Sequence, residues 1–275
     1  MEGAGIVRIT LVPTVREIEK DVLLNKSAVM FDILRASSTI STVFANGCKR
    51  VLPVEEVADA FAVAQTLPEN TYILGGERGA VKLPGFHLGN SPLEYQPDIV
   101  RDKTVILTTT NGTRAIRRTA EGSGPVLIGS LLNASAVAQK LLEMNQDIVL
   151  VCAGTRGKFS LEDTLAAGRV ILEIVKRIGT GNKDLTKDPV PSADIYLDEV
   201  PILSENDLVL EDAALAALRL AEYYAQNPLQ ALQDSLHGQK LVQLGLRQDL
   251  TYCAQVNLFD VVPVYQDGVI SVEID

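Results

Sequence analysis

Short apolar runs alternate with helical patterns from residue 5 to about residue 178 of this chain. This alternation predicts a mainly parallel sheet with helices on both of its faces. Residues 40–44, 57–64, 131–143 and 161–177 carry the apolar spacing of helices, and the last of these contains Ala166-Ala167-Gly168, which would let that helix sit close to the sheet. The runs predicted as strands are Ile6–Val12, Ala28–Leu34, Arg50–Val54, Thr71–Leu74, Val105–Thr109, Val126–Gly129 and Ile148–Cys152.

The alternation stops after residue 178. The stretch Gly179 to Asp198 gathers Gly and Pro among charges, which indicates a long surface excursion or a lid. Residues 211–225 and 228–256 are predicted to be helical, and Val261–Tyr265 with Val269–Ile274 are predicted as two closing strands. No linker separates a second hydrophobic core, so we expect one domain over residues 1–275. The predicted fold is a three-layer α/β/α domain with a mainly parallel, mixed sheet.

Composition excludes several classes of function. The net charge of -10 argues against nucleic acid as a partner, because the phosphate backbone is bound by clustered Lys and Arg. No apolar run reaches the roughly 20 residues of a membrane span, and the first residues do not resemble a signal peptide, so we expect a cytoplasmic protein without a membrane partner. Three Cys without CxxC spacing and two His indicate neither a disulfide framework nor a His-based metal cage.

Four polar segments follow predicted strands. The carboxyl ends of neighbouring parallel strands lie side by side, so we expect these segments to meet in one crevice, where open α/β sheets bind ligands. Their arginines and helix N-termini suit an anionic ligand such as phosphate, and their carboxylates suit a hard cation such as Mg²⁺. The sequence therefore predicts metal-assisted phosphate chemistry. The segments are Phe31–Thr39, Gly75–Gly79, Thr108–Arg114 and Cys152–Asp163.

Each segment also has a plainer interpretation. Asp32 could pair with Arg35 on the surface ahead of a helix capped by Ser, but an acid directly after a buried strand needs a cation. Thr108-Thr109-Thr110-Asn111-Gly112-Thr113 could surround an anion with hydroxyls and N–H groups, or it could form a turn and an N-cap. Ser160-Leu161-Glu162-Asp163 could bind Mg²⁺, or it could be a capping box in which acids simply favour the helix N-terminus.

Other reactive residues are weaker candidates. Cys152 is more readily explained as a buried, inert residue than as a nucleophile. His87 lies in the irregular loop 85–92, where it could be a general acid or base but is more often solvated or packed, and His237 is treated as structural. Arg78, just before that loop, could bind an anion bidentately.

The motifs resemble one known family, the magnesium-dependent 2-phosphosulfolactate phosphatases of coenzyme M biosynthesis. The resemblance covers most of the chain in the family order, with a weaker similarity at Ser235–Asn257. It implies a three-layer α/β/α fold and Mg²⁺-dependent hydrolysis of 2-phospho-3-sulfolactate to 3-sulfolactate and phosphate. The segments that carry it are FDILRASSTI at 31–40, GGERG at 75–79, GFHLGNSPLEY at 85–95, TTTNGTRAI at 108–116 and CAGTRGKFSLEDTLAAG at 152–168.

The substrate carries phosphate, sulfonate and carboxylate, which would need the arginines, hydroxyls and N–H groups that converge in the crevice. Magnesium would activate a water for in-line attack on phosphorus, and Asp32 as a covalent nucleophile is the alternative. By hypothesis, the predicted catalytic residues are Asp32, Glu77 and Arg35, the substrate-binding residues are Arg78, Thr110, Asn111, Gly112, Thr113, Asn90 and Ser91, and the metal ligands are Asp32, Glu162 and Asp163.

Two other functions compete with this one. A phosphatase of the same fold could act on another small phosphorylated acid, because loss of one sulfonate contact could redirect specificity. A non-catalytic protein that binds an anionic metabolite is the alternative outside enzymes, although intact acids at 32, 77, 162 and 163 argue against it. The late helices could supply the surface of a homodimer.

Overall fold

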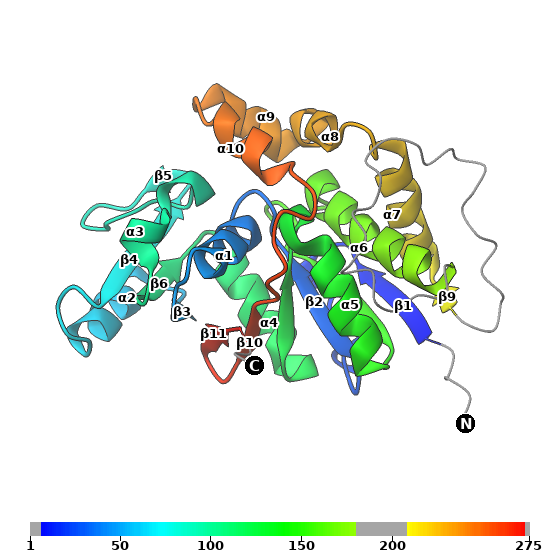
Figure 1. Ribbon diagram of the computed structural model, residues 1–275, viewed down its shortest axis with the longest axis horizontal. Coiled ribbons are helices and arrows are strands. Elements are labelled where there is room, and N and C mark those ends of the chain that lie inside the picture. The colour runs from blue at the N-terminus through cyan, green and yellow to red at the C-terminus, as the bar shows by residue number, and fades with distance from the viewer. Residues whose placement is uncertain (1–6, 180–207, 273–275) are drawn as a thin grey trace.

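One mixed sheet connects all the strands of the part of the chain that the structure, a computed structural model, describes, residues 7–179 and 208–272 (Figure 1). Its order is β5-β4-β6-β3-β11-β10-β7-β2-β8-β1-β9. The predicted lid beyond Gly179 lies outside the described residues. The strands are β1 Val7–Val12, β2 Ser27–Phe31, β3 Arg50–Pro53, β4 Tyr72–Arg78, β5 Val81–Lys82, β6 Thr104–Thr108, β7 Val126–Gly129, β8 Ile148–Cys152, β9 Leu208–Leu210, β10 Val264–Gln266 and β11 Val269–Ser271.

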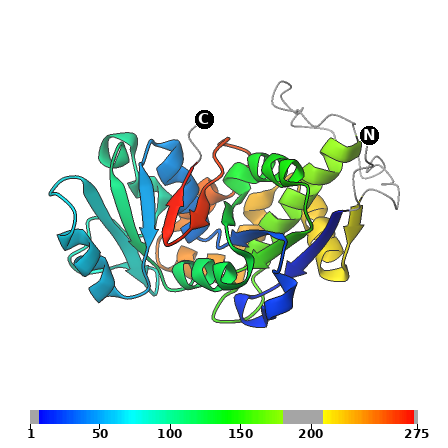
Figure 2. The same cartoon turned by 90° about the horizontal axis from the view of Figure 1, so that it is seen from below.

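The sheet has two parallel halves joined by the late hairpin. Strands β4, β6 and β3 pair in parallel, as do β7, β2, β8, β1 and β9. Between the halves, the pairs β7/β10, β10/β11 and β11/β3 are all antiparallel. The predicted closing strands therefore exist, and they fill the middle of the sheet, where the red hairpin is visible in Figure 2. Because three successive pairs reverse direction, the strands of one half run opposite to those of the other.

Helices cover both faces of the sheet, which confirms the three-layer α/β/α fold (Figures 1 and 2). Alternate residues of one strand reach opposite layers: Phe31 packs with α5 and α6, whereas Met30 packs with α1 and α4. Helix α2 covers Ile106 of β6. The helices are α1 Ala36–Ala45, α2 Val57–Gln65, α3 Pro97–Val100, α4 Gly112–Ser123, α5 Ala134–Met144, α6 Leu161–Gly179, α7 Asp212–Tyr223, α8 Pro228–Asp234, α9 Leu236–Gln243 and α10 Arg247–Cys253.

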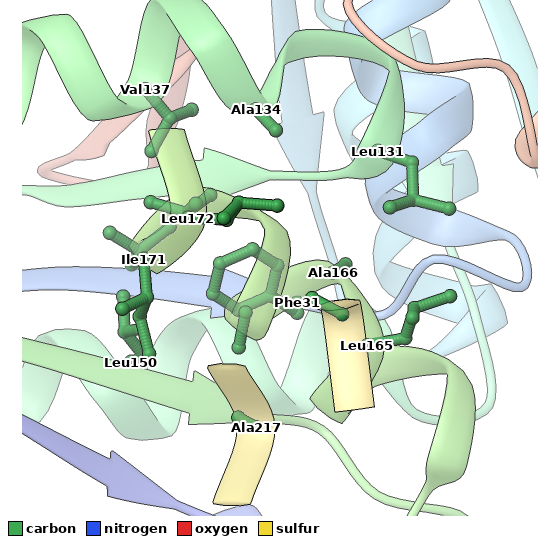
Figure 3. Close-up of a cluster of buried hydrophobic side chains, with 14 of the residues drawn as sticks. Phe31, Leu131, Ala134, Val137, Leu150, Leu165, Ala166, Ile171, Leu172 and Ala217 are labelled. Carbon is green, nitrogen blue, oxygen red and sulfur yellow. The ribbon is translucent and has the colours of Figure 1, made fainter. Parts of the chain in front are cut away.

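The largest buried cluster lies between α6 and the strands β2 and β8 (Figure 3). Phe31 and Leu150 extend from the sheet toward Leu165 and Ile171 of α6, and all four side chains are buried. Burial of such side chains stabilises the fold by roughly 1.5–3 kcal/mol each. The packing fixes α6 against β2 and β8, and thereby fixes the acids at the start of α6 beside the ends of these strands.

Strand β4 is longer than predicted. The sequence indicated a strand that ends at Leu74 and a polar turn after it, but β4 continues to Arg78. Its glycines are required by close packing and not by a turn: a Cβ at Gly75 would collide with the Tyr95 hydroxyl, and a Cβ at Gly76 would collide with the Thr108 carbonyl. Glu77 therefore projects from a strand that pairs with β5.

The segment predicted as helical over 228–256 contains separate short helices, α8, α9 and α10. Ser235 is the N-cap of helix α9, and its hydroxyl accepts a hydrogen bond from Gly238 N at 2.9 Å; the helix ends at Gln243, before Gly245, which has a φ of 79°. These breaks let the helices fold over the carboxyl end of β2, as the orange ribbons in Figure 1 show. One long helix could not form that cap.

Gly168 has a different role from the one predicted. The sequence suggested that it would bring α6 close to the sheet, but it faces α7: a Cβ at Gly168 would collide with the carbonyl oxygen of Ala217. Helices α6 and α7 make an extensive contact at this point. Gly168 therefore sets the distance between two helices of the same layer.

We expect Gly168→Ala to lower the free energy of unfolding by about 1–3 kcal/mol, because α7 must move away to make room for the methyl group. Chemical denaturation followed by circular dichroism measures the change. Gly122→Ala in α4 is the matched control, since its Cβ would first meet the end of the Leu23 side chain, and it should cost less. An unchanged denaturation midpoint for Gly168→Ala would contradict the close helix contact.

Candidate active site

Segments from both halves of the sheet line one cavity of about 570 Å³. Asp32 follows β2, Thr155 follows β8, Glu77 belongs to the end of β4, and Thr110 follows β6. The prediction that the polar segments after these strands meet is therefore confirmed. The segments do not meet at one edge of a single parallel sheet, however, because the two halves run in opposite directions and the cavity lies between their carboxyl ends. Helices α8 and α9 contribute a further wall over residues 234–240.

Asp32 is 7% exposed, so its carboxyl is held at the edge of a buried sheet. Burial raises the pKa of Asp32 to about 7; His237 opposes the shift, while the charges of Glu77 and Glu162 add to it. Gly112 lies against this carboxyl, since a Cβ there would be 2.8 Å from Oδ2. Within the described ranges no donor forms a hydrogen bond to the carboxylate, so Asp32 is free to bind a ligand.

The alternative interpretation, a surface pair of Asp32 and Arg35, is wrong. Arg35 is buried, and its Nη1 donates to Asp249 Oδ2 at 2.8 Å, while Nη2 donates to the Ala80 carbonyl at 3.2 Å. The hydroxyl of Ser91 donates to the other oxygen of Asp249 at 2.6 Å. Arg35 lines the cavity, but its guanidinium is already engaged by the protein.

Asp163 and Glu162 face different surroundings. Asp163 Oδ1 accepts from Ile33 N at 2.9 Å and Oδ2 from Gly154 N at 3.2 Å, so this carboxylate ties the segment after β2 to the loop after β8. Burial and the charge of Glu162 hold the pKa of Asp163 well above its ordinary value. Glu162 lines the cavity, with Oε1 3.6 Å from His237 Nδ1. Glu162 is thus the acid of this pair that lines the cavity.

Glu77 holds the loop after β6 in place. Its carboxylate accepts from Thr110 N at 2.7 Å, from Thr110 Oγ1 at 3.0 Å and from Ala80 N at 2.6 Å. Thr113 is buried and exchanges hydrogen bonds with Thr109, outside the cavity lining. Asn111 lines the cavity at the N-terminus of α4, whose first N–H groups have no acceptor within the helix.

Two further predicted residues differ in their placement. Asn90 lines the cavity, and its Oδ1 atom is buried without a hydrogen-bond partner in the described structure. Arg78 does not line the cavity, because its guanidinium donates to the carbonyls of Glu77 and Glu55 and to the Thr108 hydroxyl. The unpartnered oxygen makes Asn90 a candidate for binding a ligand, whereas Arg78 connects neighbouring segments through its hydrogen bonds.

The cavity also contains residues that were not predicted to belong to it. Arg156 and Lys158 come from the loop after β8, and His237 and Lys240 come from α9. Arg156 and Lys158 lie in the segment 152–168, which carries the family resemblance, but the sequence assigned neither of them a role. His237 was expected to be structural because it lies in a helical stretch beside Gly238, and the local sequence does not show that α9 reaches the end of β2. His87, the other candidate, is committed elsewhere, since its Nδ1 accepts from Leu74 N at 2.8 Å.

Asp32 and Glu162 are carboxylates of the kind that bind a hard cation such as Mg²⁺. No three His, Cys, Asp or Glu side chains of residues 7–179 and 208–272 form a group that could hold a metal by themselves. Asp32 and Glu162 nevertheless line one cavity, and so does Asn90, whose Oδ1 has no hydrogen-bond partner in the described structure. Mg²⁺ typically uses one or two carboxylates, with waters and substrate phosphate completing its shell. The residues present fit such a site.

The fold and the cavity together define an α/β protein that can bind an anion beside clustered carboxylates. Comparison with known proteins narrows this class. Residues 12–268 match the family model of the 2-phosphosulpholactate phosphatases. The chain therefore belongs to the 2-phosphosulpholactate phosphatase family, and the prediction of a phosphoric monoester hydrolase is confirmed.

Relatives from several bacteria support this membership. The chain is 39% identical to a protein of Symbiobacterium thermophilum, over 90% of this chain and 94% of the relative. It is 38% identical to one of Caldanaerobacter subterraneus subsp. tengcongensis, over 92% and 93%, and 36% identical to one of Clostridium beijerinckii, over 97% and 100%. All three are named probable 2-phosphosulfolactate phosphatase. Among the described helices, none is both long and apolar enough to cross a membrane.

Proposed function

We propose that this protein hydrolyses the phosphate monoester of 2-phospho-3-sulfolactate with the help of Mg²⁺. The observation that carries the proposal is the buried Asp32 carboxylate, without a hydrogen-bond donor in the described structure, in a cavity shared with Glu162 and with the N-terminus of α4. The names of the relatives support the choice of substrate. Assignment to coenzyme M biosynthesis, a cytoplasmic location and a homodimer remain predictions.

The acids Asp32, Glu162 and Asp163 have two different roles in this proposal, metal binding and positioning. Asp32 and Glu162 would hold the metal, and Asn90 Oδ1 would accept a hydrogen bond from its water or join its ligands. When bound, Mg²⁺ supplies charge neutralisation at the phosphate and a water of lowered pKa. Asp163 keeps the two acid-bearing segments together through the N–H groups of Ile33 and Gly154. We therefore assign Asp163 a positioning role.

The N-terminus of α4 binds the phosphate in this proposal. Asn111, the N-cap of α4, lines the cavity, and the N–H groups at this helix N-terminus, where the helix dipole favours an anion, would bind the phosphate. Glu77 fixes their direction by holding Thr110 through its N–H group and its hydroxyl. Water attacks phosphorus, the bond from phosphorus to the C2 oxygen breaks, and that oxygen leaves with a proton as the hydroxyl of 3-sulfolactate.

Phosphate release from purified protein tests the proposal. We expect release to be fastest from 2-phosphosulfolactate, slower from 2-phospholactate and 2-phosphoglycerate, and to fall to background when EDTA removes the metal. Re-addition of Mg²⁺ to the chelated sample should restore the rate and serves as the control. Equal rates with and without EDTA would contradict the metal requirement, and release only from another ester would contradict the substrate.

A further inference from the structure

The cavity contains cations that the proposed phosphate site does not use. Arg156, Lys158 and Lys240 line it, and no ion pair in the described structure engages their charged groups. Arg35, the other cation of the lining, is held by the buried carboxylate of Asp249 and by the Ala80 carbonyl. The cations available to bind a further anionic group are therefore Arg156, Lys158 and Lys240. Arg35 and Arg78, which the sequence suggested, are engaged by the protein.

A tight turn holds two of these cations at the end of β8. The N–H of Thr155 donates to the Lys158 carbonyl at 3.0 Å, and the N–H of Lys158 donates back at 3.1 Å. Arg156 and Gly157 between them have φ values of 55° and 73°, as in a two-residue type I′ turn. A long side chain is uncommon at such a position, which often marks a functional site. The turn is well fixed and presents Arg156 and Lys158 to the cavity.

The third cation comes from another element, helix α9. Lys240 follows His237 by three residues on α9, so both side chains lie on the same face of that helix, and both line the cavity. His237 is near Glu162, whereas Lys240 has no acidic partner in the described structure. Besides the acids Asp32, Glu77, Glu162 and Asp234, the lining thus includes three cations, two from the turn after β8 and one from α9.

We propose that Arg156, Lys158 and Lys240 bind the sulfonate of the substrate, and this inference rests on the proposed function. In the proposed function, the metal and the α4 N-terminus compensate the charge of the phosphate. The negative charges of the sulfonate and of the carboxylate then still need partners. The sulfonate is one atom farther from the reacting C2 oxygen than the carboxylate. It is also always ionised and a weak hydrogen-bond acceptor, so flexible point charges such as lysine suit it well.

Single substitutions separate sulfonate recognition from the rest of the site. We expect Lys158→Met and Lys240→Met each to weaken binding of 3-sulfolactate about tenfold in titration calorimetry, the loss of one charge-assisted contact in a partly exposed site. The same variants should lower kcat/KM about tenfold for 2-phosphosulfolactate and less than twofold for 2-phospholactate, which has no sulfonate. Lys49→Met, an equal change of charge outside the cavity, should alter neither.

The outcomes separate this inference from the proposed function. Equal losses on both phosphorylated substrates, or no loss on either, would overturn the sulfonate assignment. A wild-type protein that binds 3-sulfolactate through these lysines but releases no phosphate from 2-phosphosulfolactate would overturn the proposed function and leave the sulfonate site standing. Thermal melting of each variant shows whether it is folded, and the exposed or partly exposed positions of both lysines make that the expected result.

Discussion

Asp32→Asn is expected to reduce kcat/KM for 2-phosphosulfolactate by a factor on the order of 10³, the size of loss found when a key charged or polar group of an active site is removed. The carboxylate lies at the end of β2 and faces the cavity, with no hydrogen-bond donor among the described residues. Asparagine preserves the shape but not the charge. Phosphate release at saturating Mg²⁺, together with a melting curve, measures activity and folding separately.

The control for this variant is Asp98→Asn, which removes an exposed acid of α3 outside the cavity and should retain full activity. A folded Asp32→Asn protein with near-normal turnover would discard Asp32 both as a metal ligand and as a nucleophile. Loss of activity that high Mg²⁺ partly restores would favour the ligand role, because a weakened metal site can be filled by mass action.

Asp249→Ala is expected to lower the free energy of unfolding by about 3–5 kcal/mol, because it leaves the charge of Arg35 buried without its partner. The pair is 2.8 Å apart, and its side chains are 3% and 4% exposed. Ser91 would also lose the acceptor of its hydroxyl. Urea denaturation of the variant and of the wild type measures the loss.

The double variant Arg35→Met/Asp249→Leu provides the comparison. Replacing a buried ion pair by apolar side chains often costs little, so this protein should unfold at a higher urea concentration than Asp249→Ala alone. It should still be a poor enzyme, because Arg35 lines the cavity. A loss below about 1 kcal/mol for Asp249→Ala would mean that water reaches Arg35 and that the pair behaves like a surface salt bridge.

Much of the sheet could be predicted from the sequence because its strands are buried on both faces and appear as continuous apolar runs. The strand predicted at Ile148–Cys152 agrees with β8, and that at Val126–Gly129 agrees with β7. The strand β4 was cut short because Gly75 and Gly76 usually indicate a turn, and only the position of Tyr95 explains them. Local pattern carries no information on such a distant contact.

The site was predictable only in part for the same reason. The residues after β2 and β6 could be predicted because each follows a buried strand. The predicted residues that line the cavity are Asp32, Arg35, Glu77, Asn90, Thr110, Asn111 and Glu162. The partner of Arg35, however, lies 214 residues later in the chain. Lys240 likewise reaches the cavity through the breaks that fold α8 to α10 over it, and no periodicity reveals where a short helix will be placed.

The hairpin β10–β11 has a consequence for how the protein is made. Its strands pair with β7 and β3, and so connect two halves whose own strands come much earlier in the chain. During synthesis, each half can form its parallel pairs while the central edges of β7 and β3 remain unpaired. Such edges are sites of association between nascent chains. The time between translation of β7 and release of residue 271 from the ribosome is therefore the period when this protein is most exposed to aggregation.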